Sequence, residues 1–107
     1  MAIPHAKAGE VIDVRPLGPA LTNSRTTTLA KTDSLEIIRL VIPRGKDIAE
    51  HRVAGEITVQ CLEGHVVFNF GGQRRDLLAG QLLFLEGDQP HSLHAVEHSS
   101  VLVTILL

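Results

Sequence analysis

Tyrosine and tryptophan are missing from this sequence of 107 residues, and phenylalanine occurs only three times. Proteins that bind single-stranded nucleic acids stack the bases on aromatic rings, and proteins that bind duplexes need an excess of positive charge. Here the formal net charge is -2 and the isoelectric point is about 6.3. The sequence therefore argues against binding to nucleic acid or to an anionic membrane surface.

Cysteine occurs once, at Cys61, so no disulfide can form within the chain. The first residues lack the apolar core of a secretory signal. No apolar run approaches the roughly 20 residues that a transmembrane helix requires. We therefore expect a cytoplasmic protein with a single domain over residues 1–107, in which residues 1–10 form a mobile tail.

Apolar and polar residues alternate along much of the chain, and no segment has a helical period, which predicts an all-β fold. Gly, Pro, Asn and Asp separate the candidate strands by connections that are mostly short enough for antiparallel hairpins. The expected strands are Val11–Arg15, Thr26–Lys31, Leu35–Ile42, Ile48–Arg52, Glu56–Leu62, His65–Phe70, Arg74–Leu77, Leu82–Leu85, His91–Ala95 and Val101–Leu106.

The stretch Glu56–Phe70 predicts a hairpin that turns at Glu63 and Gly64. Alternate residues of each arm are apolar, so that one face of the hairpin is wholly apolar and is expected to point into the core. The expected cross-strand pairs are Cys61–Val66, Val59–Phe68 and Ile57–Phe70.

Two segments, LEIIRLVI at residues 35–42 and VLVTILL at residues 101–107, carry apolar residues on both faces of the expected strand. An antiparallel strand with one face in water should alternate instead. We therefore expect a second copy to cover the outer face of one sheet in a two-fold homodimer. Packing within a single chain is the alternative.

Two segments of the sequence each combine glycines with a histidine. The first runs from Gly45 through GKDIAEH to His51 and closes with VQCLEG at Gly64. The second, GQLLFLEGDQPH, runs from Gly80 to His91. These segments resemble the sequence motifs of the cupin family of small antiparallel jelly-roll barrels. The resemblance covers residues 35–107 and implies an all-β cupin jelly-roll barrel of antiparallel strands.

Cupins that bind a metal usually supply three histidines and one glutamate. The resemblance assigns two of these four positions to His51 and His91, but the other two fall on Val53 and Ile57. A divalent ion such as Zn, Ni, Fe or Mn needs about three protein ligands to be held firmly. The resemblance therefore implies a metal site that is incomplete.

A third ligand would have to come from the polar face of the strand that follows. Gln60 is one candidate and Glu56 a weaker one, and either would need a bulge or a shift in register to face the interior. Without such a ligand, His51 and His91 are interior imidazoles at the mouth of a pocket, hydrogen-bonded to backbone or water.

The remaining reactive residues have simpler explanations. Cys61 is expected in the apolar interior, where desolvation suppresses thiol reactivity. Asp88 either stabilises its turn or orients a neighbouring imidazole. Surface or interface positions are expected for His5, His65, His94 and His98.

Three functions remain open. A small molecule would bind in an apolar lumen with His51 and His91 at its mouth. A metal-dependent dioxygenase or isomerase would require the incomplete site to be rearranged. Metal-free acid–base catalysis would use a histidine with Asp88, but related cupin epimerases generally also use a tyrosine, which this sequence lacks. The candidate lumen walls are Ile57, Val59, Val66, Phe68 and Phe84, unless these side chains only fill the core.

Overall fold

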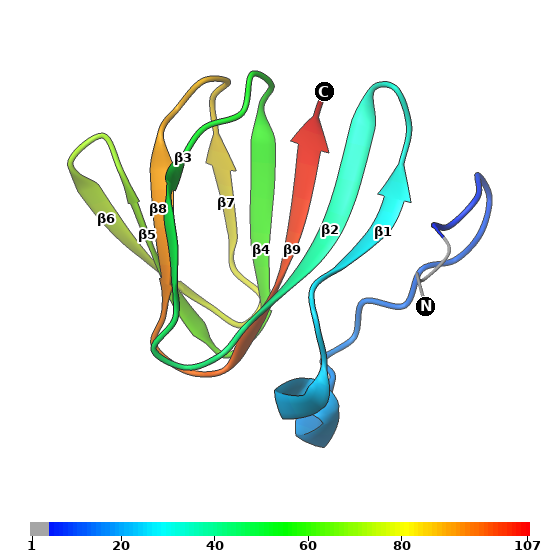
Figure 1. Cartoon of the computed structure of the whole chain (residues 1–107), viewed down its shortest axis with the longest axis horizontal. Helices are drawn as coiled ribbons and strands as arrows, with labels where there is room; N and C mark the ends of the chain where they lie inside the picture. Colours follow the sequence, from blue (N-terminus) through cyan, green and yellow to red (C-terminus); the bar gives the residue numbers. More distant parts are fainter. Residues whose placement is uncertain (1–4) are drawn as a thin grey trace.

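A computed structural model describes residues 5–107 as two antiparallel β-sheets that pack face to face (Figure 1). The first sheet has the strand order β1-β2-β9-β4-β7, and the second has the order β3-β8-β5-β6. The elements are a short 3₁₀ helix η1 (Gly18–Asn23), β1 (Thr27–Lys31), β2 (Leu35–Ile42), β3 (Asp47–His51), β4 (Ile57–Glu63), β5 (His65–Phe70), β6 (Gln73–Leu78), β7 (Leu82–Leu85), β8 (His91–Ala95) and β9 (Ser99–Leu106).

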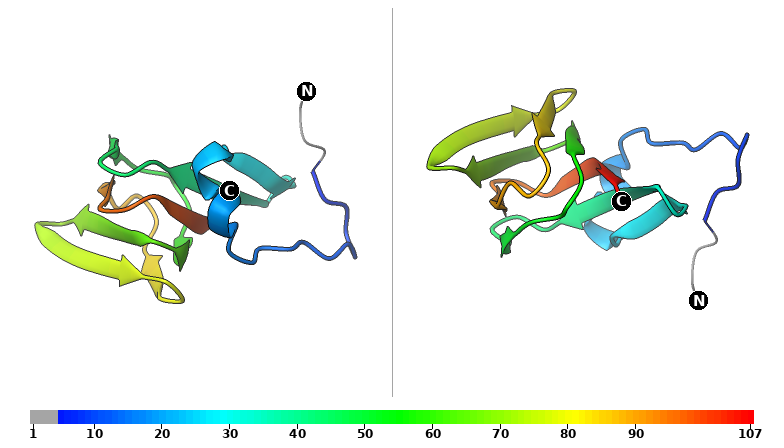
Figure 2. Two further views of the ribbon diagram at one scale, coloured as in Figure 1. Left: turned by 90° about the horizontal axis from the view of Figure 1, so that it is seen from below. Right: turned by 90° about the horizontal axis from the view of Figure 1, so that it is seen from above.

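The two layers are separate when the molecule is seen along the strands (Figure 2). This arrangement confirms the predicted all-β fold, and β2, β5, β7 and β8 have the predicted bounds. The other strands begin or end within two residues of the prediction. No helix within residues 5–107 is long and apolar enough to cross a membrane.

The predicted strand Val11–Arg15 is wrong, because this segment has no strand partner. The guanidinium of Arg39, on β2, donates hydrogen bonds of 2.6 Å to the carbonyls of Val14 and Arg15. A side chain therefore holds the segment beside the first sheet. Of the expected mobile tail, residues 1–4 lie outside the described residues, and the Ala6 N–H donates to the Leu29 carbonyl at 2.8 Å.

The predicted hairpin is also wrong in its pairing, because β4 and β5 belong to different sheets. β4 lies between β9 and β7, and β5 lies between β8 and β6, so each strand has both edges occupied already. The connection at Glu63 and Gly64 is a corner between the layers, where Gly64 has a φ of 93°. A Cβ atom at Gly64 would lie 2.2 Å from the Ser99 hydroxyl oxygen, so the corner requires glycine.

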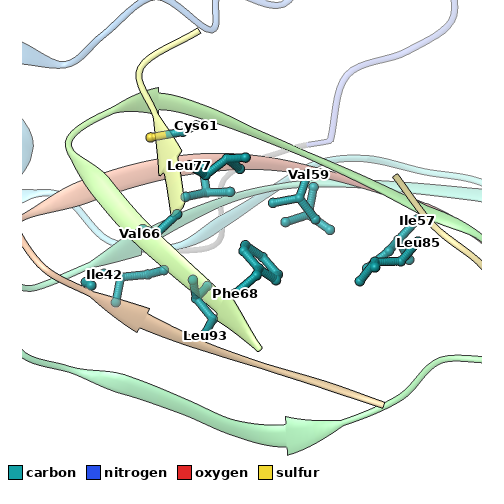
Figure 3. Packing of buried hydrophobic residues seen from close by; sticks show 12 residues of the cluster. Ile42, Ile57, Val59, Cys61, Val66, Phe68, Leu77, Leu85 and Leu93 are labelled. Carbon is teal, nitrogen blue, oxygen red and sulfur yellow. The ribbon is translucent and has the colours of Figure 1, made fainter. Parts of the chain in front are cut away.

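The inward facing of these two strands is nevertheless as predicted, and their apolar side chains meet across the interior rather than along a hairpin (Figure 3). Ile57, Val59 and Cys61 on β4 are buried, as are Val66 and Phe68 on β5. The core therefore lies between the sheets, with contributions from both layers.

The carboxylate of Glu63 ties the corner to the N-terminal segment. It accepts hydrogen bonds from the N–H groups of Leu17 and Gly18, at 2.8 and 3.0 Å, and from the hydroxyl of Ser100, at 2.7 Å. Burial raises the pKa of Glu63, but these hydrogen bonds and the nearby charge of Arg39 outweigh burial and leave the pKa below its ordinary value. The ionised carboxylate therefore stabilises the folded state above the ordinary value of 4.5, and the contribution is lost as the pH falls through the lowered pKa.

Replacing Glu63 with alanine should remove this anchor and leave two backbone N–H groups without their partner. We expect Glu63→Ala to lower the free energy of unfolding by about 2 kcal/mol at about pH 7, and by less at an acid pH below the lowered pKa of Glu63, because the parent carboxylate is then protonated. Urea unfolding at both pH values measures the difference. Glu97→Ala, at an exposed position, is the control. An equal loss at both pH values would contradict the role of the charge.

The outer face of the first sheet carries exposed apolar side chains. The strand register aligns Ile37, Thr104, Thr58 and Phe84 in one row across β2, β9, β4 and β7. On the edge strand β7, Leu82 is 61% exposed and Phe84 is 56% exposed. The homodimer expected from the sequence stays a prediction, and these two side chains are its candidate contacts.

If two copies meet through this face, lysines on β7 should keep them apart, because burying an unpaired ammonium group is costly. We expect the parent chain to sediment as a dimer and the Leu82→Lys/Phe84→Lys variant to sediment as a monomer. The matched control is Val96→Lys, at a valine that is 37% exposed and lies outside the first sheet. A monomeric parent, or a dimeric double variant, would rule out this interface.

Candidate functional site

A bulge in β3 decides which way His51 points. β3 pairs with β8 through Ile48 and Leu93, and the register then shifts so that His51 pairs with His91. In a regular strand, residues three apart point to opposite faces. Because of the shift, Ile48 and His51 line the same cavity between the sheets.

The two imidazoles lie against each other where β3 ends and β8 begins. Their ring centroids are 4.4 Å apart, and the ring planes meet at 60°. His91 is only 5% exposed, whereas His51 is exposed to solvent. The pair thus runs from the interior to the surface, at the end of the barrel where the β3–β4 and β7–β8 connections lie (Figure 1).

The pair borders a cavity of about 40 Å³, which we call the chamber. Apart from the two histidines, the side chains that line it are Leu40, Ile48, Ile57, Val59, Phe68, Leu93 and Val103. The Phe68 ring is 6.3 Å from the His91 ring. Every lining side chain except the two imidazoles is therefore apolar.

The structure brings most of the candidate wall residues together and excludes two. Ile57, Val59 and Phe68 line the chamber, and Figure 3 shows them in the space between the sheets. Val66 is fully buried in the core but does not line the chamber. Phe84 requires a correction, because its pairing with Thr58 places it on the outer face of the first sheet.

Four lining residues were not among the candidates drawn from the sequence. They are Leu40, Ile48, Leu93 and Val103. Strand alternation carries a signal for Leu93, which follows His91 by two residues and so shares its face. Ile48 carries no such signal, because it lies three residues before His51 and regular alternation puts it on the other face.

The third metal ligand considered from the sequence does not join the imidazoles. Gln60 pairs with Leu82 and Leu102 and lies on the outer face of β4, whereas Ile57 faces the chamber. The side chain of Glu56 is exposed at the start of that strand. Within residues 5–107, no three His, Cys, Asp or Glu side chains are grouped so that they could hold a metal ion. Two imidazoles in an aliphatic setting do not fit the divalent ion that the cupin resemblance implies.

Each imidazole is held by the backbone carbonyl two residues before it. The Nδ1 atom of His51 lies 3.0 Å from the Ala49 carbonyl oxygen, and that of His91 lies 2.9 Å from the Gln89 carbonyl oxygen. Asp88 makes no hydrogen bond to either ring in the part of the chain that the structure describes. Instead its N–H donates to the Val53 carbonyl at 2.8 Å, and its φ of 60° marks a tight turn.

The other reactive residues lie away from the chamber. Burial raises the pKa of the Cys61 thiol, which is fully buried against the Glu63 carbonyl. On the second sheet, His65 binds the carboxylate of Asp76 at 2.7 Å. His94 binds the carboxylate of Asp47 on the neighbouring strand. The further histidines are His5, which is exposed, and His98, which accepts a hydrogen bond from the backbone of Arg44.

Known proteins share this architecture. The sequence model of the AraC-like ligand binding domain matches residues 41–104. A conserved protein of unknown function from Streptococcus pyogenes has 22% identity and a TM-score of 0.76, over 99% of this chain and 94% of the other. A cupin superfamily protein from Desulfitobacterium hafniense has 21% identity and a TM-score of 0.78, over 95% of this chain and 99% of the other. An RmlC-like cupin from Methanocaldococcus jannaschii has 14% identity and a TM-score of 0.74, over 92% of this chain and 93% of the other.

These similarities confirm the predicted cupin barrel. A search of curated proteins found no match.

A carboxylate at position 57 should convert the chamber into a metal site, because Ile57 lines it together with both imidazoles. We expect Ile57→Glu to bind Ni²⁺ or Zn²⁺ about two orders of magnitude more tightly than the parent, by titration calorimetry. The metal should also raise the Tm of the variant, which carries an unpaired carboxyl group without it. Gln60→Glu, on the outer face of the same strand, is the matched control. Equal affinity in the two variants would show that position 57 does not face the imidazoles.

Proposed function

The chain belongs to the family of AraC-like ligand-binding domains, and from that premise we propose that it binds a small molecule at the mouth of the chamber. His51 and His91 are the polar anchors. The observation that carries the proposal is the contact between two imidazoles at the border of an otherwise apolar cavity. Small-molecule sites combine apolar walls with a few well-placed polar groups in this way.

The size of the chamber limits how the ligand binds. A water molecule needs roughly 10 to 15 Å³ of such a cavity, so about 40 Å³ has room for a group of a few heavy atoms. Pockets that enclose a whole drug-sized ligand measure about 300 to 1,000 Å³. The ligand therefore inserts a short apolar group into the chamber, contacts the imidazoles at the mouth, and leaves the rest of its surface outside.

The polar groups of the site favour the binding of a small molecule over the two catalytic alternatives. A metal-dependent dioxygenase or isomerase needs an ion held by about three ligands, and the chamber offers two imidazoles. Acid–base catalysis by a histidine and Asp88 needs the carboxylate to orient a ring, but backbone carbonyls hold both Nδ1 atoms.

We also propose a cellular location and an oligomeric state for the protein, from residues outside the chamber. The lone Cys61 is a free thiol in the core, which suits a reducing cytoplasm. Exposed Leu82 and Phe84 support a homodimer through the outer face of the first sheet. That face and the chamber lie on opposite sides of the first sheet, so dimerisation leaves the mouth free.

A thermal-shift screen of small alcohols, amines, organic acids, sugars and aromatics tests the proposal. Compounds that bind should raise the Tm of the parent, because a ligand at about 100 times its Kd adds about 2.7 kcal/mol to stability. We expect this shift to disappear in His51→Ala and in His91→Ala. His65→Ala and His94→Ala, on the second sheet and away from the chamber, should keep it. A screen in which every shift survives both chamber substitutions would exclude the site.

A further inference from the structure

The hydrogen bonds of the two imidazoles define their tautomers. Each Nδ1 atom lies within hydrogen-bond distance of a backbone carbonyl oxygen, at Ala49 for His51 and at Gln89 for His91. A carbonyl oxygen only accepts hydrogen bonds, so Nδ1 must carry the hydrogen in both rings. In a neutral imidazole the other nitrogen, Nε2, then has a lone pair and can only accept.

The chamber therefore offers acceptors and no donors from its side chains. Both imidazoles border it, and the rest of its lining is aliphatic or aromatic carbon. Their close contact, with centroids 4.4 Å apart, brings the two acceptors to the same small region. Among the side chains that line the chamber, the two imidazoles are therefore the polar partners for a ligand group.

From this geometry we infer that the ligand is a hydrogen-bond donor, an alcohol or an amine with a short aliphatic head, and that ketones and carboxylates are poor ligands. This inference rests on the proposed function and adds the chemical class of the ligand to it. A ketone at the same place brings one acceptor against another, so that the buried imidazole of His91 gains no hydrogen-bond partner from the ligand. An unmet buried hydrogen-bonding group costs about 1 to 3 kcal/mol, and sites built around such groups reject analogues that cannot pair with them.

The volume of the chamber sets the size of the aliphatic head. A water molecule needs roughly 10 to 15 Å³, so a cavity of about 40 Å³ accommodates roughly three heavy atoms. An isopropyl group fills this space, and its hydroxyl or amino substituent is then beside the imidazoles. Isopropanol and acetone share a carbon skeleton and differ in whether the oxygen can donate, so they form a matched pair of probes.

The tautomers are tested first, without any ligand. Long-range proton–nitrogen NMR correlations on the parent at about pH 8 should show Nδ1 protonated and Nε2 unprotonated in His51 and His91. A protonated Nε2 in both rings would overturn the inference.

The matched probes test ligand class. In titrations followed by the methyl resonances of Val59 and Val103, which line the chamber, isopropanol should bind about tenfold more tightly than acetone. Acetate, which like acetone cannot donate a hydrogen bond, should bind no more tightly than acetone. Affinities in the millimolar range are expected for ligands of this size.

Two variants test whether the imidazole nitrogens cause the preference for isopropanol over acetone. His91→Phe keeps a ring at this position but removes the lone pair, so the preference for isopropanol should fall to about one half or less of its parent value. His94→Phe, on the outer face of β8, should leave it unchanged. If the two probes bind equally and both shift the chamber methyls, the ligand class is wrong while the proposed site stands. If neither probe shifts those methyls, both the site and the ligand class are wrong.

Discussion

The β-bulge in β3 is the constraint on which the chemistry of this barrel depends. Regular alternation after Ile48 would point His51 to the outside, and only the register shift before His51 sets it opposite His91. Each ring then bonds to the carbonyl two residues earlier in its own chain, at Ala49 and at Gln89. Backbone geometry thus sets the orientation of both imidazoles, and no second side chain is needed to hold them. The site can therefore keep its arrangement while its neighbours change to aliphatic residues.

The charged side chains that tie the N-terminal segment to the first sheet lie apart from this site. Arg39 binds carbonyls of the N-terminal segment, and Glu63 binds its amides together with Ser100. Both lie on or beside the outer side of the first sheet, because the inner side is occupied by the core. Charged groups near the imidazoles would compete for Nδ1 and alter the tautomers. Within residues 5–107, the hydrogen-bond partner of each ring is a backbone carbonyl.

Alternation predicts β1 to β9 and the side of β4 and β5 that faces the core, because facing within a regular strand follows the local period. It also predicts a strand at Val11–Arg15, where the structure has none. It was not enough to predict pairing, because the partners of β4 are distant in sequence and the Glu63 corner resembles a tight turn. The same limit explains Phe84, which was placed inside although its pairing with Thr58 puts it outside. Ile48 was missed because a bulge leaves no compositional trace. The local sequence pattern thus indicates which face of a strand a residue lies on, but not which strands lie beside that strand.

Val53 and Ile57 occupy the two positions at which the cupin resemblance implies further metal ligands. Metal-binding histidines commonly donate their second nitrogen to a carbonyl, which turns the lone pair of the first toward the ion. His51 and His91 keep this arrangement, but Ile57 lines the chamber where a carboxylate would balance the charge of a cation. An imidazole nitrogen that cannot hold a metal ion firmly can still accept a hydrogen bond from a hydroxyl group or an amine. A hydrogen bond from a neutral hydroxyl group needs one imidazole nitrogen as acceptor and no carboxylate to balance a charge. This apolar chamber therefore suits such a ligand better than it suits a divalent ion.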